Sequence, residues 1–361
     1  MKILFIEPSG AGGIAHYTYA LAESLAEQGL EAEIVTGQRW NLQPASKNIT
    51  IHPLFRGKKT NPWRLLRQIR QSKLKADIVH WQSTTHPELM LWLMRLLPLK
   101  SLPWVFTVHN VLPHEKKQSS VAIYQKIYRR MSGLIFHTQY SKREFQRIYP
   151  KMDIPHAVIP LGEYGFLPQA EKTVSTSCDP NKILFFGNIR RYKGLDILIH
   201  ALAEVRQAIP HANLLIVGQA LEDFQLYRQL IDELGLQNCV QTRLEYIPDE
   251  DIPTIMENAA VVALPYRHID QSAVLLLALA SGKPVVASQV GGLEEVVDHG
   301  RTGILVPPED VSALAHALIS LLQDRDTMTA IGKAAAEDVK TRFSWAAIAE
   351  KTKSFYQTIL G

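Results

Sequence analysis

The feature of this chain that most constrains its fold is a series of short apolar runs separated by stretches with helical periodicity. The runs are rich in Val, Ile, Leu and Phe, which is typical of strands buried on both faces of a parallel sheet. They form two sets of six: Ile3–Ile6, Ala32–Val35, Asp77–Trp81, Trp104–His109, Leu134–His137 and Val158–Pro160, then Ile183–Phe186, Leu214–Val217, Val240–Thr242, Val261–Leu264, Pro284–Ala287 and Gly303–Val306. This pattern predicts an α/β protein with two Rossmann-like domains in tandem.

The chain has 361 residues, enough for two domains of the usual ~150 residues each. We expect a first domain over residues 1–165 and a second over residues 182–343. Phe166–Asn181 is predicted to be a linker, because it is polar, contains two prolines and shows no periodicity. Apolar side chains at helical spacing predict a last helix over residues 344–361, which we expect to cross back to the first domain.

Charge is distributed unevenly between the two halves. Residues 1–165 contain 22 Lys and Arg against 11 Asp and Glu, whereas the remainder contains 17 against 24. The overall net charge of +4 conceals this difference. Opposite signs suggest that the two domains have different partners, and that the partner of the first is acidic.

The first half gathers its cations in Arg56–Lys59, Asn61–Lys75, Lys116–Lys117 and Tyr124–Arg130. The second of these segments predicts a basic amphipathic helix with Trp63, Leu66 and Ile69 on one side. Such a helix can lie on an anionic membrane surface, and a solvated surface helix is the alternative. We find no recognition helix and no RNA-binding motif, so we expect no nucleic-acid partner.

Cysteine content and hydropathy bear on the compartment. Cys178 and Cys239 are too few for a disulfide framework or a four-ligand zinc site, which favours a reducing cytosol. The opening MKILFIEPSG is too short for the apolar region of a signal peptide, and Leu89–Leu97 falls well short of the ~20 residues that span a bilayer. We expect a cytoplasmic protein, at most peripheral at the inner membrane face.

Loops that join a strand to a helix are candidates for anion binding. Pro8–Ile14 contains Gly12 and Gly13, so its backbone can approach an anion closely. It matches neither the dinucleotide-binding fingerprint nor a Walker loop. A merely tight turn is an equally good interpretation of this loop taken alone.

The second half contains two comparable loops. Gly187 ends a strand and is followed by Arg190, Arg191 and Lys193, at the strand end where α/β sheets bind ligands. Arg can bind a phosphate with two parallel hydrogen bonds and Lys supplies a point charge, although a solvated basic loop is an equal alternative. Gln271–Ala273 opens an apolar helix and would offer free N–H groups.

Ten segments of this chain occur in an order and at a spacing that, taken together, are specific for one protein family. They resemble the retaining nucleotide-sugar glycosyltransferases of family 4 over nearly the whole chain. The resemblance implies the α/β GT-B fold, in which two Rossmann-like domains face each other across a cleft and the second binds most of the donor nucleotide. The segments are GAGGIAHYTYALAESLAEQG, FTVHNVLPHE, HTQYSKREF, VIPLG, GNIRRYKG, YIPDEDIP, ALASGKPVVAS, VGGLEEVV, TGILVPPED and RFSW.

The resemblance also implies roles for individual residues. Arg190 and Lys193 match the pair that holds the donor diphosphate. His109 matches a histidine beside the transferred sugar, where it would orient that sugar, and a satisfied core histidine is the alternative. Further implied donor-binding residues are Gly12 and Gly13 in the loop over the reaction centre, Gly187, the helix start Gln271, Ser272, Ala273 and Val274, and Glu295 after the paired glycines.

The sequence departs from the family pattern at three positions. Many members carry two glutamates eight residues apart, where this chain has Ile269 and Leu277. A branch of the family has Q-S-G-V in this loop, and Gln271–Val274 is similar to that form. Asn188 stands where an arginine is usual, and the arginine follows at position 190.

The chemistry of cleaving a nucleotide-sugar asks for stabilisation of a leaving diphosphate. Cations and oriented N–H groups can supply it without a metal. Two Asp-x-Asp strings, at residues 249–251 and 324–326, fall where helices begin, a place that favours acids anyway. We predict no essential metal and no cofactor. The resemblance implies front-face attack, with the leaving phosphate taking the acceptor proton.

The expected activity is that of a retaining hexosyltransferase. Its donor would be a UDP- or GDP-sugar, and its acceptor a glycan or lipid-linked molecule, acidic in character, in cell-surface polysaccharide or glycolipid biosynthesis. One alternative is another GT-B enzyme, a nucleotide-sugar epimerase or a phosphorylase. The other is a non-catalytic nucleotide- or glycan-binding relative, motivated by the missing glutamates.

Overall fold

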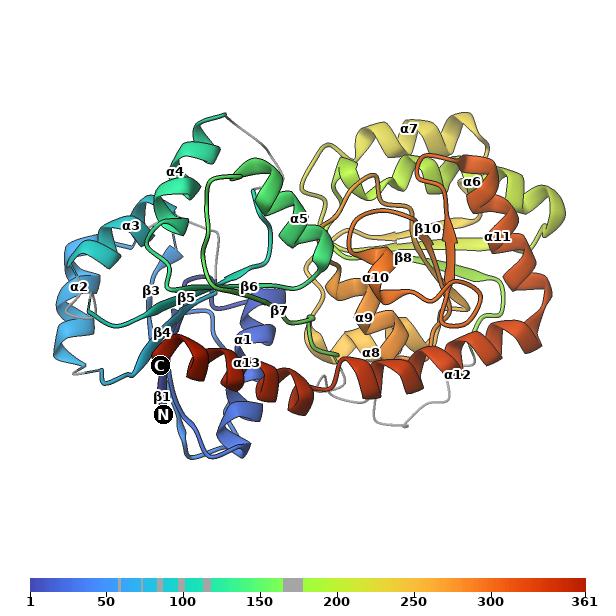
Figure 1. Cartoon of the computed structure of the whole chain (residues 1–361). Helices are drawn as coiled ribbons and strands as arrows, with labels where there is room; N and C mark the ends of the chain where they lie inside the picture. Colours follow the sequence, from blue (N-terminus) through green and yellow to red (C-terminus); the bar gives the residue numbers. More distant parts are fainter. Residues whose placement is uncertain (58–59, 73, 83–86, 97–100, 113–117, 165–177) are drawn as a thin grey trace. The chain divides into compact units, whose positions relative to one another are not determined.

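The computed structural model describes the chain except for residues 58–59, 73, 83–86, 97–100, 113–117 and 165–177 (Figure 1). The chain divides into two compact units. Met1–Gly162 and Phe343–Gly361 form the first unit, and Glu163–Arg342 form the second. The C-terminal helix therefore belongs to the first unit, although it follows the second in sequence. Of the linker predicted at 166–181, only residues 178–181 are described.

The first unit is built on a parallel sheet of seven strands in the order β3-β2-β1-β4-β5-β6-β7. The strand order reverses at β1, which pairs with β2 on one side and with β4 on the other. Ligands of open α/β sheets bind at the carboxyl ends of strands beside such a reversal. The strands are β1 (Lys2–Glu7), β2 (Glu31–Gly37), β3 (Ile49–Phe55), β4 (Ile78–Trp81), β5 (Trp104–Val108), β6 (Gly133–Phe136) and β7 (His156–Val158).

Helices cover both faces of this first sheet. On one face α1 and α13 lie side by side, as Figure 1 shows. On the other face α2 to α5 pack against alternate strand residues, such as Leu4 and Ile6 of β1, to form a continuous apolar core. The helices are α1 (Gly13–Glu27), α2 (Pro62–Gln71), α3 (Pro87–Leu96), α4 (Gln118–Tyr128), α5 (Gln139–Ile148) and α13 (Trp345–Leu360).

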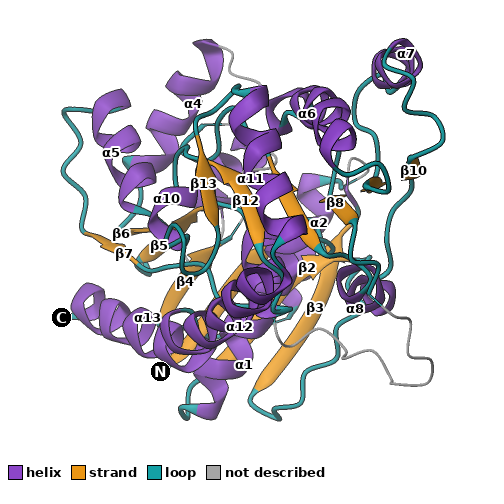
Figure 2. Cartoon of the chain, turned by 90° about the vertical axis from the view of Figure 1, so that its right-hand side faces the viewer, coloured by secondary structure: helices purple, strands orange, loops and turns teal. Residues whose placement is uncertain are grey.

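The second unit repeats this plan with a six-stranded sheet in the order β10-β9-β8-β11-β12-β13, reversing at β8. The helix α6 packs against α11, and α9 packs against α12. Figure 2 labels α6, α11 and α12 among the purple helices and draws the strands in orange. The strands are β8 (Lys182–Phe186), β9 (Asn213–Val217), β10 (Val240–Arg243), β11 (Val261–Leu264), β12 (Val285–Ser288) and β13 (Ile304–Val306). The helices are α6 (Leu195–Ala208), α7 (Gln225–Glu233), α8 (Ile252–Glu257), α9 (Ala273–Ala280), α10 (Leu293–Val296), α11 (Val311–Gln323) and α12 (Arg325–Arg342), with two short 3-10 helices, η2 (Arg191–Lys193) and η3 (Asp249–Asp251).

All twelve strands expected from the apolar runs are present, and the two parallel α/β sheets confirm the predicted fold class. The sequence analysis missed β3, which lies at the edge of the first sheet. This strand contains His52 and Pro53. Its four Ile, Leu and Phe residues are buried or half-buried, but exposed or polar residues interrupt them, so they form no continuous apolar run. Edge strands tolerate proline and polar residues because one side makes no ladder hydrogen bonds.

The predicted basic helix exists as α2, but its apolar residues are arranged differently from the expectation. Leu66 and Ile69 are buried with Leu65 in the core of the first unit. Trp63 does not share their side: it is 67% exposed and meets Trp92 edge-on, with 5.1 Å between ring centroids. The expected grouping was wrong because Trp63 lies in the first turn, outside the stripe that packs on the sheet.

No helix in the described part of the chain is long and apolar enough to cross a membrane.

Candidate active site

The loop after β8 is shaped by Gly187. Its φ of +96° is strained for any residue with a side chain. A Cβ on Gly187 would lie 2.9 Å from Lys193 Nζ and 3.3 Å from Val274 Cγ2. Three residues that the sequence analysis selected, from two loops 80 positions apart in the chain, therefore meet at the carboxyl ends of β8 and β11.

Lys193 is the main cation at this place. Only 7% of the residue is exposed, and its Nζ lies 5.6 Å from the centroid of the Tyr266 ring. No carboxylate in the described residues lies within ion-pairing distance of it. Burial, together with the neighbouring charge of Arg190, lowers the pKa of Lys193 from 10.5 to about 8. A buried ammonium held by a ring face alone is a site prepared for an anion.

The start of α9 supplies backbone donors beside Lys193. Ser272 caps this helix, because its hydroxyl oxygen accepts a hydrogen bond from the Leu275 N–H at 3.2 Å. The N–H groups of Ala273 and Val274 have no partner within the helix, since the first turn of a helix cannot satisfy its own donors. The side-chain oxygen of Gln271 is also buried and accepts no hydrogen bond from the described residues.

Arg267, which the sequence analysis did not select, joins the two anion-binding loops. Its guanidinium donates to both carboxylate oxygens of Asp196, at 3.0 and 2.7 Å, and to the Arg191 carbonyl at 2.7 Å. Its own N–H donates to the Tyr192 carbonyl at 2.7 Å. The carboxylate of Asp196 raises the pKa of Arg267 further above its usual range. These bonds hold η2 and the start of α6 against the loop after β11.

Gly194 permits the same close approach. It has a φ of +70°, and a Cβ at this position would lie 2.0 Å from the Pro265 carbonyl oxygen. Real Cβ atoms do not come so near to an oxygen, so only glycine allows the two loops to touch here. The contact could not be predicted from the sequence, because Pro265 is 71 positions away from Gly194.

Glu295 lies in the short helix α10, after the paired glycines. The Gly292 N–H donates to the Ile269 carbonyl at 3.3 Å, which places this turn against the loop after β11. The Glu295 carbonyl accepts a hydrogen bond from Arg342 Nη2 at 2.8 Å. Ile269 and Leu277, at the positions of the family glutamates, are both buried.

The glycine loop of the first unit is held by a residue that the sequence analysis missed. Glu7 is fully buried, and its carboxylate accepts hydrogen bonds from the N–H groups of Ser9 and Gly10, at 3.1 and 2.7 Å, and from the Thr36 hydroxyl at 3.1 Å. Gly12 has a φ of +80° with open space where a Cβ would be, and Gly13 begins α1. The loop is thus fixed at its start and open at its end.

His109 directly follows β5 in the same unit and is 2% exposed. Its Nδ1 lies 3.1 Å from His137 Nε2, and its Nε2 lies 3.3 Å from the Gln82 side chain. Tyr17 of α1 packs edge-on against the ring, with 5.1 Å between centroids. Burial holds the pKa of His109 well below its usual range, so the ring is neutral at pH 7.

The two Asp-x-Asp strings have structural partners. Asp251 pairs with Arg243 Nη2 at 2.7 Å, and Asp324 accepts a hydrogen bond from the Thr327 N–H at 3.0 Å at the start of α12. Among the residues that the structure describes, no three His, Cys, Asp or Glu side chains gather as metal ligands would. Independence from metal remains a prediction.

Two family profiles match the chain. The profile described as Glycosyltransferase Family 4 matches residues 11–162, and the profile described as Glycosyl transferases group 1 matches residues 180–324. The chain belongs to the family 4 glycosyltransferases. The resemblance seen in its motifs is thereby confirmed.

Other proteins are similar to this glycosyltransferase over nearly its whole length. The D-inositol 3-phosphate glycosyltransferase of Corynebacterium jeikeium is 28% identical over 397 residues, covering 97% of this chain and 92% of the relative. The sucrose-phosphate synthase of Thermosynechococcus elongatus has a TM-score of 0.81 at 23% identity, covering 99% of both chains. Anabaena Alr3699/HepE, crystallised with UDP and glucose, has a TM-score of 0.79 at 22% identity, covering 99% of this chain and 100% of that one. The fold is the GT-B fold, with a Rossmann-like sheet in each unit.

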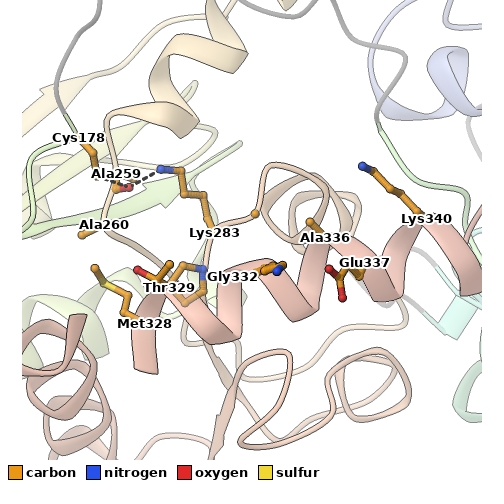
Figure 3. Close-up of a pocket in the computed structure, with 13 residues that line it drawn as sticks. Cys178, Ala259, Ala260, Lys283, Met328, Thr329, Gly332, Ala336, Glu337 and Lys340 are labelled. Carbon is orange, nitrogen blue, oxygen red and sulfur yellow. Dashed lines mark hydrogen bonds between the residues drawn. The ribbon is translucent and has the colours of Figure 1, made fainter. Parts of the chain in front are cut away.

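A separate pocket of about 470 Å³ in the second unit of this glycosyltransferase lies away from the loops described above (Figure 3). It is lined by residues that precede β8, β11 and β12 and by residues of α12, so it lies at the amino ends of these strands rather than at their carboxyl ends. The Lys283 ammonium donates hydrogen bonds to the carbonyls of Glu257 and Ala259, which precede β11, both at 2.9 Å. The ammonium thus satisfies a carbonyl group at the C-terminus of α8.

The predicted site residues of the glycosyltransferase accordingly fall into two groups. Gly187, Lys193 and Val274 meet in the second unit, with Arg190, Gln271, Ser272 and Ala273 beside them in the same two loops, and the turn before Glu295 adjoins the second loop. Gly12, Gly13 and His109 belong to the first unit, where Tyr17 links the helix that Gly13 begins to the His109 ring.

Proposed function

We propose that this glycosyltransferase transfers a sugar, with retention of configuration, from a nucleotide-sugar to a glycan or lipid-linked acceptor. The observation that carries the proposal is the buried ammonium of Lys193, which has no carboxylate partner among the described residues and lies beside the N–H groups at the start of α9. An unpaired buried charge destabilises a fold unless a ligand compensates it. A diphosphate has the charge and the several acceptor oxygens that this arrangement needs.

The same groups account for catalysis in the proposed reaction. As the bond from the anomeric carbon to the diphosphate oxygen breaks, negative charge grows on that oxygen. Lys193, Arg190 and the α9 N–H groups stabilise it without having to reorganise. The acceptor oxygen bonds to the anomeric carbon on the face that the diphosphate leaves, and its proton passes to the departing phosphate. No metal is required by this scheme.

The identity of the nucleotide is tested first. A thermal-unfolding screen with UDP, GDP and ADP, alone and as sugar conjugates, should show one nucleotide that raises the melting temperature, since a ligand of the folded state stabilises it. UDP heads the panel because Alr3699/HepE was crystallised with it. The selected nucleotide-sugar should then release nucleoside diphosphate in the presence of acceptor.

Controls in the same assay separate the alternatives. Arg190→Ala should lower the rate of diphosphate release, whereas Arg191→Ala, exposed in the same loop, should leave it near wild type. Turnover without any acceptor would favour an epimerase, and a requirement for inorganic phosphate without nucleotide would favour a phosphorylase. Failure of every nucleotide to bind would contradict the proposed donor site.

The acceptor is proposed to be acidic and to be reached at an anionic membrane surface. Arg64 and Arg67 on α2 are exposed beside Trp63, and neither pairs with a carboxylate among the described residues. The relatives named D-inositol 3-phosphate glycosyltransferase have a phosphorylated molecule in their name. Since the apolar stripe of α2 is buried in the core, contact with a bilayer would rest on Trp63 and these cations alone.

Vesicle binding tests the membrane contact. The protein should sediment with vesicles of phosphatidylglycerol at low salt, less so at high salt, and not with phosphatidylcholine alone. Trp63→Ala with Arg64→Ala should weaken this binding, whereas Leu226→Ala, which removes an equally exposed apolar side chain in the second unit, should not. If the wild type does not sediment with anionic vesicles, the proposed membrane contact is wrong, and only the proposal of an acidic acceptor is kept.

A further inference from the structure

A row of buried polar side chains crosses the first sheet beneath α1 and α13. His80 lies in β4 and Thr107 in β5, while Gln82, His109 and His137 directly follow β4, β5 and β6. All five are 3% exposed or less. Residues two apart in a strand point to the same face. The intervening residues, such as Trp81 and Val108, belong to the apolar core on the opposite face.

The proton positions in this row follow from one fixed acceptor. His137 Nδ1 lies 3.0 Å from the Ile159 carbonyl oxygen, which can only accept, so this nitrogen carries a proton. Burial lowers the pKa of His137 to about 4, and the ring is therefore neutral at pH 7 with no proton on Nε2. His137 Nε2 must then accept its hydrogen bond from His109 Nδ1, 3.1 Å away.

The same reasoning fixes His109. Its Nδ1 carries the proton, and as a neutral ring it has a lone pair on Nε2. The Gln82 side-chain oxygen, an acceptor, lies 3.3 Å from this Nε2, while the Gln82 side-chain nitrogen lies 3.3 Å from both ring nitrogens of His80. A half-turn of that amide, which leaves its shape unchanged, brings its NH₂ to this lone pair and its oxygen to the His80 ring, whose protonated nitrogen can donate to it. The opposite assignment, with the His109 proton on Nε2, would require His137 to donate from both nitrogens and to carry a buried charge.

The far end of the row is tied to the C-terminal helix. His80 Nε2 lies 2.7 Å from the Thr107 hydroxyl, and His80 Nδ1 hydrogen-bonds the hydroxyl of Tyr356 in α13. Hydroxyl groups can donate or accept, so this end adapts to either tautomer of His80. The Ile159 carbonyl thus sets the direction of the hydrogen bond that His109 Nδ1 donates to His137 Nε2.

We propose that His137 is a positioning residue for glycosyl transfer, which holds the neutral His109 ring in the Nδ1–H tautomer and in one orientation. This inference rests on the proposed function and on the place beside the transferred sugar that the family resemblance implies for His109. His137 acts through His109 and touches no substrate itself. The hydrogen bond between the two rings fixes both the tautomer and the orientation of the His109 ring.

The tautomer is measured directly by ¹⁵N NMR of the protein labelled at histidine. The expected spectrum at pH 7 shows a protonated Nδ1 and an unprotonated Nε2 for His109, assigned by its loss in His109→Gln. This readout needs no substrate, so it stands apart from the nucleotide-sugar assay. A His109 with its proton on Nε2, or a charged His109, would overturn the proposal.

Kinetics test the positioning role. His137→Phe should lower kcat by about 10–100-fold, by analogy with the loss of a group that orients a metal-binding histidine, with little change in the KM for the donor. His137→Gln, whose amide oxygen can still accept from His109, should recover part of the rate. His156→Phe, at an exposed histidine of β7, is the control. Wild-type kcat in a folded His137→Phe would overturn the role.

Discussion

Replacing Lys193 by Met is expected to stabilise the protein while abolishing sugar transfer. In the folded chain burial and Arg190 lower the pKa of Lys193 from 10.5 to about 8. At about 1.4 kcal/mol per pKa unit, the charged form destabilises the fold by about 3 kcal/mol. That cost is fully present below pH 8, decreases as the pH rises from 8 to 10.5, and is absent above. Methionine fills a similar volume without the charge.

The activity of the Lys193→Met variant should change in the opposite direction. Loss of one preorganised donor to a developing oxyanion costs about 2.7–4 kcal/mol of transition-state stabilisation, or about 100–1000-fold in kcat. Denaturant unfolding at pH 7 and diphosphate release would measure the two effects. Arg191→Met, exposed in the same loop, should change neither. A Lys193→Met protein that is less stable than wild type and still active would contradict this description of the site.

Gly194→Ala is expected to have the largest effect on stability among the glycine substitutions of the site. The new Cβ would lie 2.0 Å from the Pro265 carbonyl oxygen, so the loop after β11 must move away from η2. Such a movement breaks the hydrogen bonds of Arg267 to Arg191 and Tyr192. We expect a loss of about 3 kcal/mol or more, since a steric clash adds to backbone strain, together with loss of nucleotide binding.

Gly235 provides a matched control for this substitution. Its φ of +67° is close to the +70° of Gly194, but nothing lies within 4 Å of the position that a Cβ would occupy. Gly235→Ala should therefore cost only the left-handed backbone penalty of about 1–2 kcal/mol and leave nucleotide binding intact. Equal losses for the two variants in a denaturant titration would show that the contact between the loops does not matter.

The fold was largely predictable because its signals are local. Twelve strands follow from apolar runs such as Val261–Leu264, and parallel pairing follows from their alternation with helices. The missed strand β3 has no such run, since an edge strand with Pro53 need not be apolar on both faces. The side on which Trp63 lies was also missed, because only packing decides which residues of a helix face the sheet.

The site was predictable where a loop itself carries the signal. Gly187, Lys193 and Ser272 occur in loops whose place at strand ends follows from the sequence. The burial of Lys193, and the parts of Arg267 and Glu7, depend on partners distant in sequence, such as Asp196 and Thr36. The polar row around His109 does leave a trace, since His80 with Gln82 and Thr107 with His109 are spaced two apart on strands that are otherwise apolar.

The measurement that tests the central claim most directly is the proton uptake that accompanies nucleotide binding. Calorimetric titration of the selected nucleoside diphosphate at pH 8, in two buffers of different ionisation enthalpy, gives the number of protons bound. With a pKa of about 8, Lys193 is half-protonated in the free protein, and a bound diphosphate restores its charge. The predicted result is uptake of about half a proton per site at pH 8, and none in Lys193→Met. Binding without proton uptake in the wild type would contradict the account.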